Sequence, residues 1–286
     1  MSDFSALKFL MIKSQPRAVG ASFEATGALK VIIQSAHIDG ADVWWQRPPS
    51  PFVSIRVNDT RTTTDMQAET YDPSWIRQTF FLLVKSPMET VQLKVYDHHE
   101  YRKHGLLGAT SFDMNRLSAN GMALDAQLPL LKEKKRKGDL LCSLFYYPIS
   151  ISPEKETGVG IVRLIVHRAE DLLPSDGSSR NLNIKPKAKI RLDWDGPTIH
   201  ATPRRRILEN RSAVWESQHE FLCFDKCACV VYVDVSDPAL GHVSLSLPDL
   251  IEATTTKRGP WPLSGSASGK LFASAEWRPL NLEANT

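Results

Sequence analysis

Cationic side chains alternate with apolar ones in one short run of the chain. Lys187, Lys189 and Arg191 are separated by Ala188 and Ile190. Because successive side chains of a β-strand point to opposite faces, this run predicts a strand with one apolar and one cationic face. Ammonium and guanidinium groups bind phosphate oxygens, so the cationic face is a candidate site for phosphate-bearing ligands. An ordinary solvated strand face is the alternative.

Further cations extend this candidate site. One residue precedes the run, and a triplet is expected on or near the neighbouring strand, so that the full set is Lys185, Lys187, Lys189, Arg191, Arg204, Arg205 and Arg206. Each Lys or Arg close to an anionic membrane surface contributes about 1 kcal/mol of binding free energy. The set therefore predicts binding that is useful but weakens with salt.

A second basic cluster occupies residues 132–137, with five cations and one acid in Lys-Glu-Lys-Lys-Arg-Lys. It follows an apolar segment around Leu130 and precedes a strand-like segment, so we expect a mobile hairpin tip. A solvated loop is the simplest interpretation. A second electrostatic contact with a membrane and a nuclear-targeting signal are the alternatives.

Motifs for catalysis are missing from the sequence. It contains no Gly-x-Ser-x-Gly elbow, His-Glu-x-x-His helix, phosphate-binding glycine loop or dinucleotide fingerprint. The densest polar cluster consists of His98, His99, Glu100 and His104, which are residue types that bind transition metals, but solvation in a surface loop is the simpler interpretation. We therefore expect a protein that is not an enzyme and needs no cofactor.

The cysteines do not suggest zinc or disulfides. Cys227 and Cys229 form a Cys-x-Cys pair, but no second Cys or His pair follows at zinc-finger spacing. We expect them to be small core residues of a strand. Four cysteines, three of them close together, are too few for a secreted disulfide scaffold, so a reducing, cytoplasmic compartment fits best.

Length and charge narrow the possible classes of protein. A chain of 286 residues is long enough for about two domains. Its net charge of +3 is only mildly basic, whereas a dedicated nucleic-acid binder would be more basic, so we expect no nucleic-acid partner. No apolar run is long enough to span a bilayer, and the first residues do not resemble a signal peptide. Any membrane contact is therefore expected to be peripheral.

An internal repeat organises the elements that must position these residues. Residues 27–36 align with residues 160–169, an offset of 133 positions that also relates Leu107-Gly108 to Leu240-Gly241. The apolar segments of each copy are short, β-rich and separated by turn residues, which is typical of antiparallel sandwiches. We predict an all-β fold with two tandem antiparallel β-sandwich domains, at 27–148 and 158–282. Residues 1–26 form an N-terminal extension and residues 149–157 a linker.

Several local motifs occur together in the first copy. They are Pro51-Phe52-Val53, Asp72-Pro73-Ser74-Trp75, and Val95-Tyr96-Asp97 ahead of a loop closed by Leu107-Gly108. In this combination the chain resembles the C2 domain family over nearly its whole length. The second copy, through Val214-Trp215-Glu216, Trp261-Pro262-Leu263 and the segment 274–281, resembles the fungal tricalbins, which are relatives of the extended synaptotagmins.

This resemblance implies a function at membranes. Tricalbin-like proteins tether the endoplasmic reticulum to the plasma membrane and carry a lipid-transfer module, and the chain resembles only their C-terminal C2 part. We expect a peripheral phospholipid-binding module for membrane tethering or lipid transport at contact sites between these membranes. The expected partners are anionic phospholipids, with phosphoinositides as candidates, and protein partners or a tricalbin-type oligomer are further candidates. A C2-type protein-interaction scaffold without direct lipid binding is the alternative function.

The resemblance also allows the calcium-site positions to be checked. C2-type sites bind calcium through aspartates on loops at one end of the sandwich. Ser50, His99 and Gly105 stand at such positions in the first copy, and Lys185 stands at one in the second. Trp75 and Gly108 are 33 positions apart but Trp215 and Gly241 only 26, so the second loop is seven residues shorter. The vestigial positions that remain are Asp39, Asp42 and Asp97, so we expect calcium-independent binding and no metal.

Trp44 and Trp45 fall in the loop that faces the bilayer in C2 domains. Tryptophan favours the membrane interface because its ring is apolar while its N–H can stay hydrated. The pair therefore predicts a membrane-insertion loop. Packing over the end of the sandwich or against a partner protein is the alternative.

Overall fold

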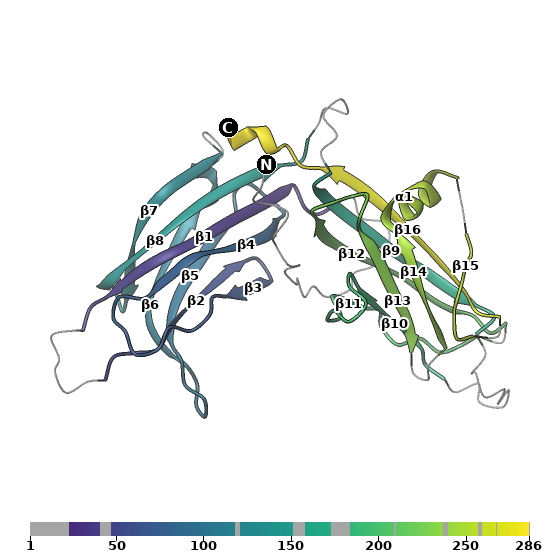
Figure 1. Cartoon of the computed structure of the whole chain (residues 1–286), viewed down its shortest axis with the longest axis horizontal. Coiled ribbons are helices and arrows are strands. Elements are labelled where there is room, and N and C mark those ends of the chain that lie inside the picture. Colours follow the sequence, from purple (N-terminus) through teal and green to yellow (C-terminus); the bar gives the residue numbers. More distant parts are fainter. Residues whose placement is uncertain are drawn as a thin grey trace. The chain divides into compact units, whose positions relative to one another are not determined.

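The computed structural model of the chain describes residues 23–40, 47–117, 121–150, 158–172, 184–208, 210–236, 240–256, 259–266 and 268–285. These residues form two compact units (Figure 1). One unit holds Ala25–Ile149 together with the residues from Asn281 onward, and the other holds Ser150–Leu280 together with Phe23 and Glu24. Regular structure in both units is mostly antiparallel strand, which confirms the all-β prediction.

The described part of the first unit contains eight strands in the order β3-β2-β5-β6-β7-β8-β1-β4. Their bounds are β1 (Gly27–Ile38), β2 (Pro51–Val57), β3 (Thr60–Thr63), β4 (Ser74–Val84), β5 (Thr90–Asp97), β6 (Gly105–Asp113), β7 (Met122–Lys132) and β8 (Lys135–Pro148). A 3-10 turn, η1 (Met114–Arg116), follows β6. Strands β6 and β7 share one residue pair, Ala109 with Leu131, so the sheet folds over at this point into two layers (Figure 1).

Alternating burial along the strands builds the core between these layers. In β5, Val91, Leu93 and Val95 are fully buried, whereas the residues between them face outward. Trp75 at the start of β4 is also buried, and its indole N–H donates to the Asp65 carbonyl at 2.8 Å. The large apolar ring is therefore taken from water without leaving its polar N–H unpaired.

The described part of the second unit forms two four-stranded sheets, in the orders β11-β10-β13-β14 and β12-β9-β16-β15. The strands are β9 (Gly160–Glu170), β10 (Lys187–Arg191), β11 (His200–Ala201), β12 (Ala213–Cys223), β13 (Val230–Ser236), β14 (Gly241–Ser246), β15 (Trp261–Pro262) and β16 (Lys270–Pro279). A second 3-10 turn, η2 (Leu282–Asn285), follows and belongs to the first unit. One contiguous apolar core, which includes Val162, Ile190 and Val233, fills the space between the two sheets.

One helix, α1 (Leu247–Thr256), lies among the described residues of the second unit. The Ser246 hydroxyl lies 2.5 Å from the Asp249 carboxylate and accepts the Asp249 backbone N–H at 3.2 Å, an arrangement that starts a helix by satisfying a free amide of its first turn. Leu247 and Leu250 are fully buried and attach the helix to the core. The sequence pattern around residues 248–252 predicts this short helix.

Two histidines are buried in the second core. His200 on β11 and His219 on β12 stack with ring centroids 4.6 Å apart, and a His200 ring nitrogen lies 3.0 Å from the Ser217 hydroxyl. Burial lowers the pKa of His200 to about 4. Burial, and secondarily the nearby His200, lowers the pKa of His219 to about 3. Both side chains are therefore neutral at physiological pH.

Candidate functional site

Strand β10 has the two faces that its sequence predicts. Ala188 and Ile190 are fully buried in the core, whereas Lys187, Lys189 and Arg191 are half-buried on the opposite, outer face. The cations lie across from β13, where Lys187 pairs in register with Ser236, Lys189 with Asp234, and Arg191 with Tyr232. The outer face of the sheet therefore carries a row of cations next to one carboxylate.

Arg191 is held in a cluster that balances its charge. Its guanidinium lies 2.6 Å from the Asp234 carboxylate and also donates to the carbonyl of Trp194. The guanidinium lies 5.8 Å from the centre of the Trp194 ring, and Trp194 is half exposed. Arg191 thus forms part of a paired cluster, and its availability for an external phosphate is lower than the sequence suggests.

The arginine triplet lies beside β10, at the edge of the same sheet. The Thr202 N–H donates to the Ala188 carbonyl at 2.9 Å, and the Arg205 N–H donates to the Pro186 carbonyl at 3.1 Å. The side chains next to this backbone contact are exposed: Lys185, Arg204, Arg205 and Arg206. These four residues with Lys187 and Lys189 are called the second basic surface below.

The first unit carries an equivalent cluster that the sequence reasoning missed. A small pocket on the outer face of β2, β3 and β5 is lined by Ser54, Arg56, Arg61, Gln92, Lys94 and Tyr96. The Arg61 Nε donates to the Ser54 hydroxyl at 2.8 Å, and its guanidinium lies 5.9 Å from the Tyr96 ring centre. Three of the six lining residues are cations and none is a carboxylate. Arg56, Arg61 and Lys94 are called the first basic surface below.

The two basic surfaces lie on corresponding strands of the two copies, but their cations do not coincide residue for residue. Pro51 begins β2, and Pro186 immediately precedes β10. When these prolines are aligned, Ser54 matches Lys189 and Arg56 matches Arg191, in each case 135 positions later. Period-two alternation places these residues on the outer face of both strands. Arg56 could have been found by applying the alternation rule to residues 51–57. Arg61 and Lys94 come from two other strands, and no local run connects them.

The calcium-loop positions of the first unit are engaged in other contacts. One Asp97 carboxylate oxygen accepts the Ser50 backbone N–H at 2.8 Å, and the other lies 3.5 Å from His99 Nε2. Gly105 begins β6 beside this pair, where a β-carbon would lie 3.7 Å from His99 Nε2. Within the described ranges, no group of three or more His, Cys, Asp or Glu side chains is arranged to hold a metal ion.

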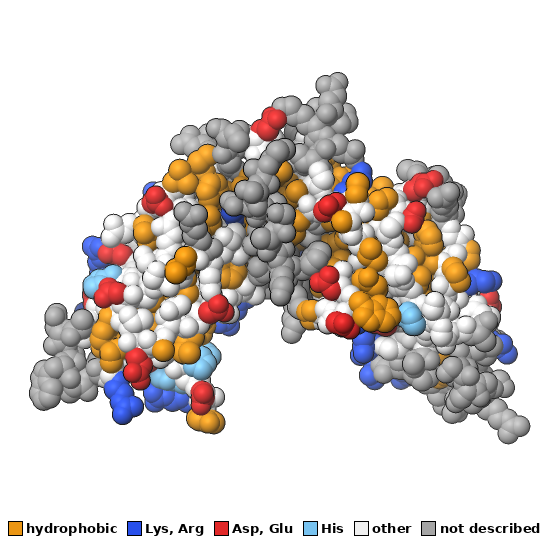
Figure 2. Space-filling view, in the orientation of Figure 1, with side chains coloured by type: hydrophobic (Ala, Val, Ile, Leu, Met, Phe, Trp, Pro, Cys, Tyr) orange, Lys and Arg blue, Asp and Glu red, His pale blue; other side chains and the backbone are white. Residues whose placement is uncertain are grey.

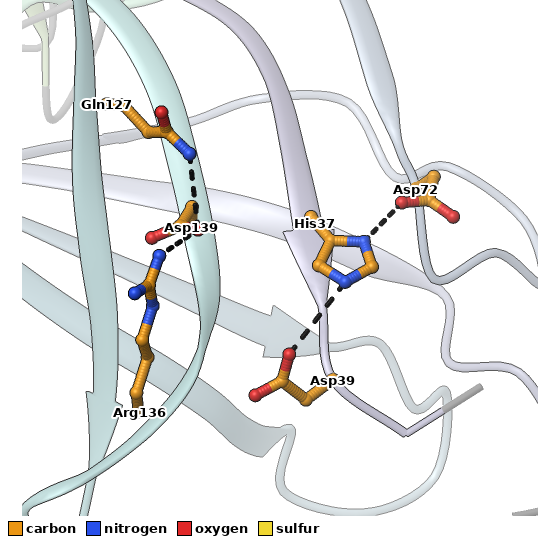
Figure 3. A network of polar contacts seen from close by, with 6 residues as sticks. All are labelled: His37, Asp39, Asp72, Gln127, Arg136 and Asp139. Atoms are coloured by element: carbon orange, nitrogen blue, oxygen red, sulfur yellow. Dashed lines mark hydrogen bonds and ion pairs between the residues drawn. The ribbon is translucent and has the colours of Figure 1, made fainter. Parts of the chain in front are cut away.

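Asp39 belongs to a separate network at the end of β1 (Figure 3). His37 lies between Asp72, with Nδ1 2.6 Å from the carboxylate, and Asp39, with Nε2 at 3.8 Å. The hydrogen bond to Asp72 is the main reason why the pKa of His37 is raised. Asp42, Trp44 and Trp45 lie outside the described residues, so their predicted roles remain predictions.

The basic cluster at residues 132–137 is a tighter element than the sequence suggests. Strand β7 ends at Lys132 and β8 begins at Lys135, so only Glu133 and Lys134 form the turn, both with positive φ. Consecutive positive φ values are typical of two-residue hairpins. Arg136 pairs with Asp139 at 2.5 Å, and Gln127 donates to the same carboxylate (Figure 3). The cluster is therefore an ordered hairpin that carries four exposed lysines.

The cysteine prediction is partly wrong. Cys223 and Cys229 are buried in the core of the second unit, but Cys227 is exposed in the turn before β13. The Asp225 carboxylate accepts the backbone N–H groups of Cys227 and Ala228 in this turn. Cys142 is buried in β8, and this burial raises the pKa of its thiol to about 12.

A serine, a histidine and a glutamate meet on the outer face of β12, β9 and β16. His167 Nε2 lies 2.9 Å from the Ser274 hydroxyl, and Nδ1 lies 2.9 Å from the Glu216 carboxylate. These are the residue types of a nucleophile, a base and an acid, but Ser274 is only 8% exposed and lies within a paired strand. The arrangement therefore links three neighbouring strands through side-chain hydrogen bonds.

Comparisons with known proteins agree with this architecture. The C2 domain family model matches residues 27–130 and 160–260. An uncharacterized protein of Schizosaccharomyces pombe is 29% identical over 213 residues, which cover 72% of this chain, and Tricalbin-1 of Saccharomyces cerevisiae is 21% identical over 287 residues, which cover 94%. The chain spans only 17% and 23% of the lengths of these two relatives.

The fold is also similar to a solved tandem pair. The calcium-bound pair of C2 domains from Extended-Synaptotagmin 2 superposes with a TM-score of 0.67 at 18% identity, covering 90% of this chain and 98% of that chain. A search of the described residues for a helix long and apolar enough to cross a bilayer found none. The motif combination, the two sandwiches and the family match all agree. The chain therefore belongs to the C2 domain family, as a tandem pair of C2 domains that resembles the C2 region of the tricalbins.

Proposed function

We propose that the chain is a non-catalytic module that binds anionic phospholipids through the outer faces of both C2 domains. The observation that carries the proposal is that cations gather on the outer faces of corresponding strands, β2 in the first domain and β10 in the second. The pocket of the first basic surface has three cations and no carboxylate in its lining. Phosphate groups have the charge and the acceptor oxygens that such a site needs.

The module is proposed to act at membrane contact sites, in membrane tethering or lipid transport. Its similarity to Tricalbin-1 supports this role. Two basic surfaces in one chain also provide two membrane contacts, and linked contacts increase the overall affinity well beyond that of either one. Phosphoinositides are the proposed preferred lipids because they carry more phosphate charge than other anionic phospholipids.

Binding is proposed to be independent of calcium. In the first domain, Ser50, His99 and Gly105 stand where calcium-binding C2 domains have carboxylate ligands. In the second domain, Lys185 places a cation at such a ligand position. Asp97, the calcium-site aspartate that remains at the end of β5, already accepts the Ser50 N–H. Calcium would have to displace these contacts, and the site offers fewer carboxylate ligands than calcium needs.

Vesicle co-sedimentation with the whole chain tests the proposal. Binding to vesicles that contain phosphatidylserine or a phosphoinositide should be measured at low and high salt, and with calcium or a chelator. The reversed variants are R56E/K94E in the first basic surface and K187E/K189E in the second. Each should weaken binding by about tenfold or more, since two charges change sign near the membrane.

A matched control keeps the charge change but moves it elsewhere. The double variant K85E/R116E alters two exposed cations of the first domain outside both basic surfaces. It should retain binding to anionic vesicles. Equal binding by all variants, or no binding by the unmodified chain, would instead favour the protein-interaction scaffold.

A further inference from the structure

The loop between β5 and β6, residues 98–104, contains three histidines, two of which, His98 and His104, pack against each other. The rings of His98 and His104 stack with centroids 5.1 Å apart. Both rings meet the edge of Phe52 on β2, with centroid distances of 6.3 Å for His98 and 5.0 Å for His104. The sequence prediction of simple solvation is therefore wrong for these side chains, which are half-buried.

A hydrogen bond inside the loop requires one histidine to be unprotonated at a defined atom. The His99 backbone N–H donates to His104 Nδ1 at 3.1 Å. A ring nitrogen can accept a hydrogen bond only when it carries no proton, whereas both ring nitrogens of an imidazolium are donors. Protonation of His104 therefore breaks this contact. It also places a positive ring against His98, so the packed form of the loop fits neutral histidines.

The charges around the histidines balance as long as the rings are neutral. Asp97 lies 3.5 Å from His99, and Glu100 is the acid within the loop; Arg102 and Lys103 are its two fixed cations. Two negative and two positive charges give a net charge of zero for residues 97–104. Two neighbouring segments also carry charge: Arg47 precedes β2, and Glu69 follows β3. These two residues add one charge of each sign. The Glu69 N–H donates to the Ser50 hydroxyl. Protonation of the three histidines would change the balance to +3.

The end of the loop presents an aromatic side chain to solvent. Tyr101 is 96% exposed, and the loop projects from the end of the first sandwich (Figure 1). Figure 2 shows apolar, acidic, basic and histidine side chains gathered at this end of the unit. Tyrosine is favoured at membrane interfaces because its ring is apolar and its hydroxyl remains hydrated.

We propose that residues 98–104 form a proton-gated contact with anionic membranes. In its neutral form the loop is compact and carries no net charge, so it adds little to membrane binding. Acidification charges the histidines, opens the His99–His104 contact and attracts the loop to anionic headgroups, where Tyr101 enters the interface. Protons would thus supply the positive charge that calcium supplies to an aspartate-rich loop. The inference builds on the proposed lipid-binding function.

The test compares vesicle binding by the full chain at about pH 7.4 and about pH 6.0, a range in which histidine side chains change charge. Affinity for phosphatidylserine vesicles should rise by about fivefold or more on acidification, since each added cation near the surface favours binding. The double variant H98Q/H104Q should bind normally at the higher pH and lose most of this rise. The glutamine that replaces His104 cannot become cationic, but its side-chain oxygen can still accept the His99 N–H.

Two controls separate this loop from a general effect of acid. His242→Gln removes a half-buried histidine of the second domain that contacts Trp194, and His37→Gln removes one from the network at the end of β1. Both variants should keep the acid-induced rise. Circular dichroism at both pH values checks that each variant remains folded. Tyr101→Trp provides a direct signal, because its fluorescence should shift to the blue only with anionic vesicles at the lower pH.

The outcomes distinguish the two proposals. Strong binding at neutral pH with no rise on acidification, or a rise that H98Q/H104Q retains, overturns the proton gate and leaves the basic surfaces in place. Acid-dependent binding that requires His98 and His104 but is unaffected by R56E/K94E and K187E/K189E supports the gate and overturns the proposed function. Equal acid-induced binding to uncharged vesicles also contradicts the gate.

Discussion

Arg191 and Asp234 illustrate how much the contribution of a single cation depends on its partner. The two groups lie 2.6 Å apart on the outer face of neighbouring strands, and both are partly exposed, so their attraction is screened by solvent. Asp234 nevertheless places a negative charge within the row of cations on β10. Any anionic ligand that approaches this row must overcome that charge.

The variant Asp234→Asn is therefore expected to bind anionic vesicles more tightly. Removing one negative charge next to the membrane corresponds to about 1 kcal/mol, or roughly a fivefold increase in affinity. Co-sedimentation at low salt measures the change, and the increase should shrink at high salt. Glu283→Gln also removes one negative charge, from an exposed side chain in η2, and should have a smaller effect. Unchanged or weaker binding by Asp234→Asn would argue against β10 as a contact.

The buried histidine pair makes the stability of the second domain depend on pH. Burial holds the pKa of His200 at about 4 and that of His219 at about 3, whereas histidine in an unfolded chain has a pKa of about 6.5. Below that value the unfolded chain binds protons that the folded domain does not. The stability is therefore complete above about pH 6.5 and falls as the pH decreases toward the folded pKa values.

Each histidine is expected to contribute a slope approaching about 1.4 kcal/mol per pH unit once the pH lies well below 6.5. Urea unfolding at several pH values between about 7 and 4.5, followed by the fluorescence of the second domain, measures this decrease. His219→Phe removes one titrating group and should make the dependence less steep. A second-domain transition that is equally stable across this range would contradict the burial of neutral rings.

At the scale of elements, the β1–β8 pairing depends on a glycine. Gly138 lies opposite Ile38 in the antiparallel register and has a φ of +126°. A side chain at this position would place its β-carbon 1.8 Å from the His37 carbonyl oxygen, a contact that the backbone must shift to avoid. Only glycine fits this close approach of two strands.

Gly138→Ala is expected to lower the free energy of unfolding of the first domain by about 2 kcal/mol or more, from backbone strain and the displaced strand. Chemical denaturation of the full chain, monitored for the first-domain transition, provides the measurement. Gly105→Ala is the matched control, because its β-carbon would meet its nearest atoms only at 3.7 Å. Similar unfolding midpoints for the two variants would contradict the close approach at Gly138.

The strands themselves could be predicted well, because their signal is local. Alternation of cationic and apolar residues correctly predicted the two faces of β10. The first basic surface could not be found in the same way, because Arg56, Arg61 and Lys94 come from three strands and meet only through the sheet register. The packing of His98 against His104 also depends on Phe52, which is distant in sequence.

At the scale of the whole molecule, the internal repeat predicts two sandwiches, and the structure has two compact units. The repeat does not reveal which outer-face residues have partners. Arg191 is paired with Asp234, a contact between β10 and β13 that no sequence motif indicates. The number of domains could thus be predicted from the sequence. The effective charge of each domain surface could not, because it depends on which residues the sheet register brings together.

Two basic surfaces on one chain also predict bivalent behaviour. The quadruple variant R56E/K94E/K187E/K189E should lose nearly all binding to anionic vesicles, and each double variant should retain a weaker, salt-sensitive affinity. Vesicle clustering, measured by turbidity, should require both surfaces because each must contact a different vesicle. Clustering by a variant with only one intact surface would show that tethering arises elsewhere in the chain.

The exposure of Cys227 has a practical consequence for such experiments. All four cysteines of the chain are described, and Cys227 is the exposed one, whereas Cys142, Cys223 and Cys229 are buried. Buried thiols react slowly because reagents reach them poorly. A maleimide dye should therefore attach selectively to the turn between β12 and β13. The unmodified chain can then be labelled at one known position. A dye at this position reports the orientation of the second domain on a supported bilayer.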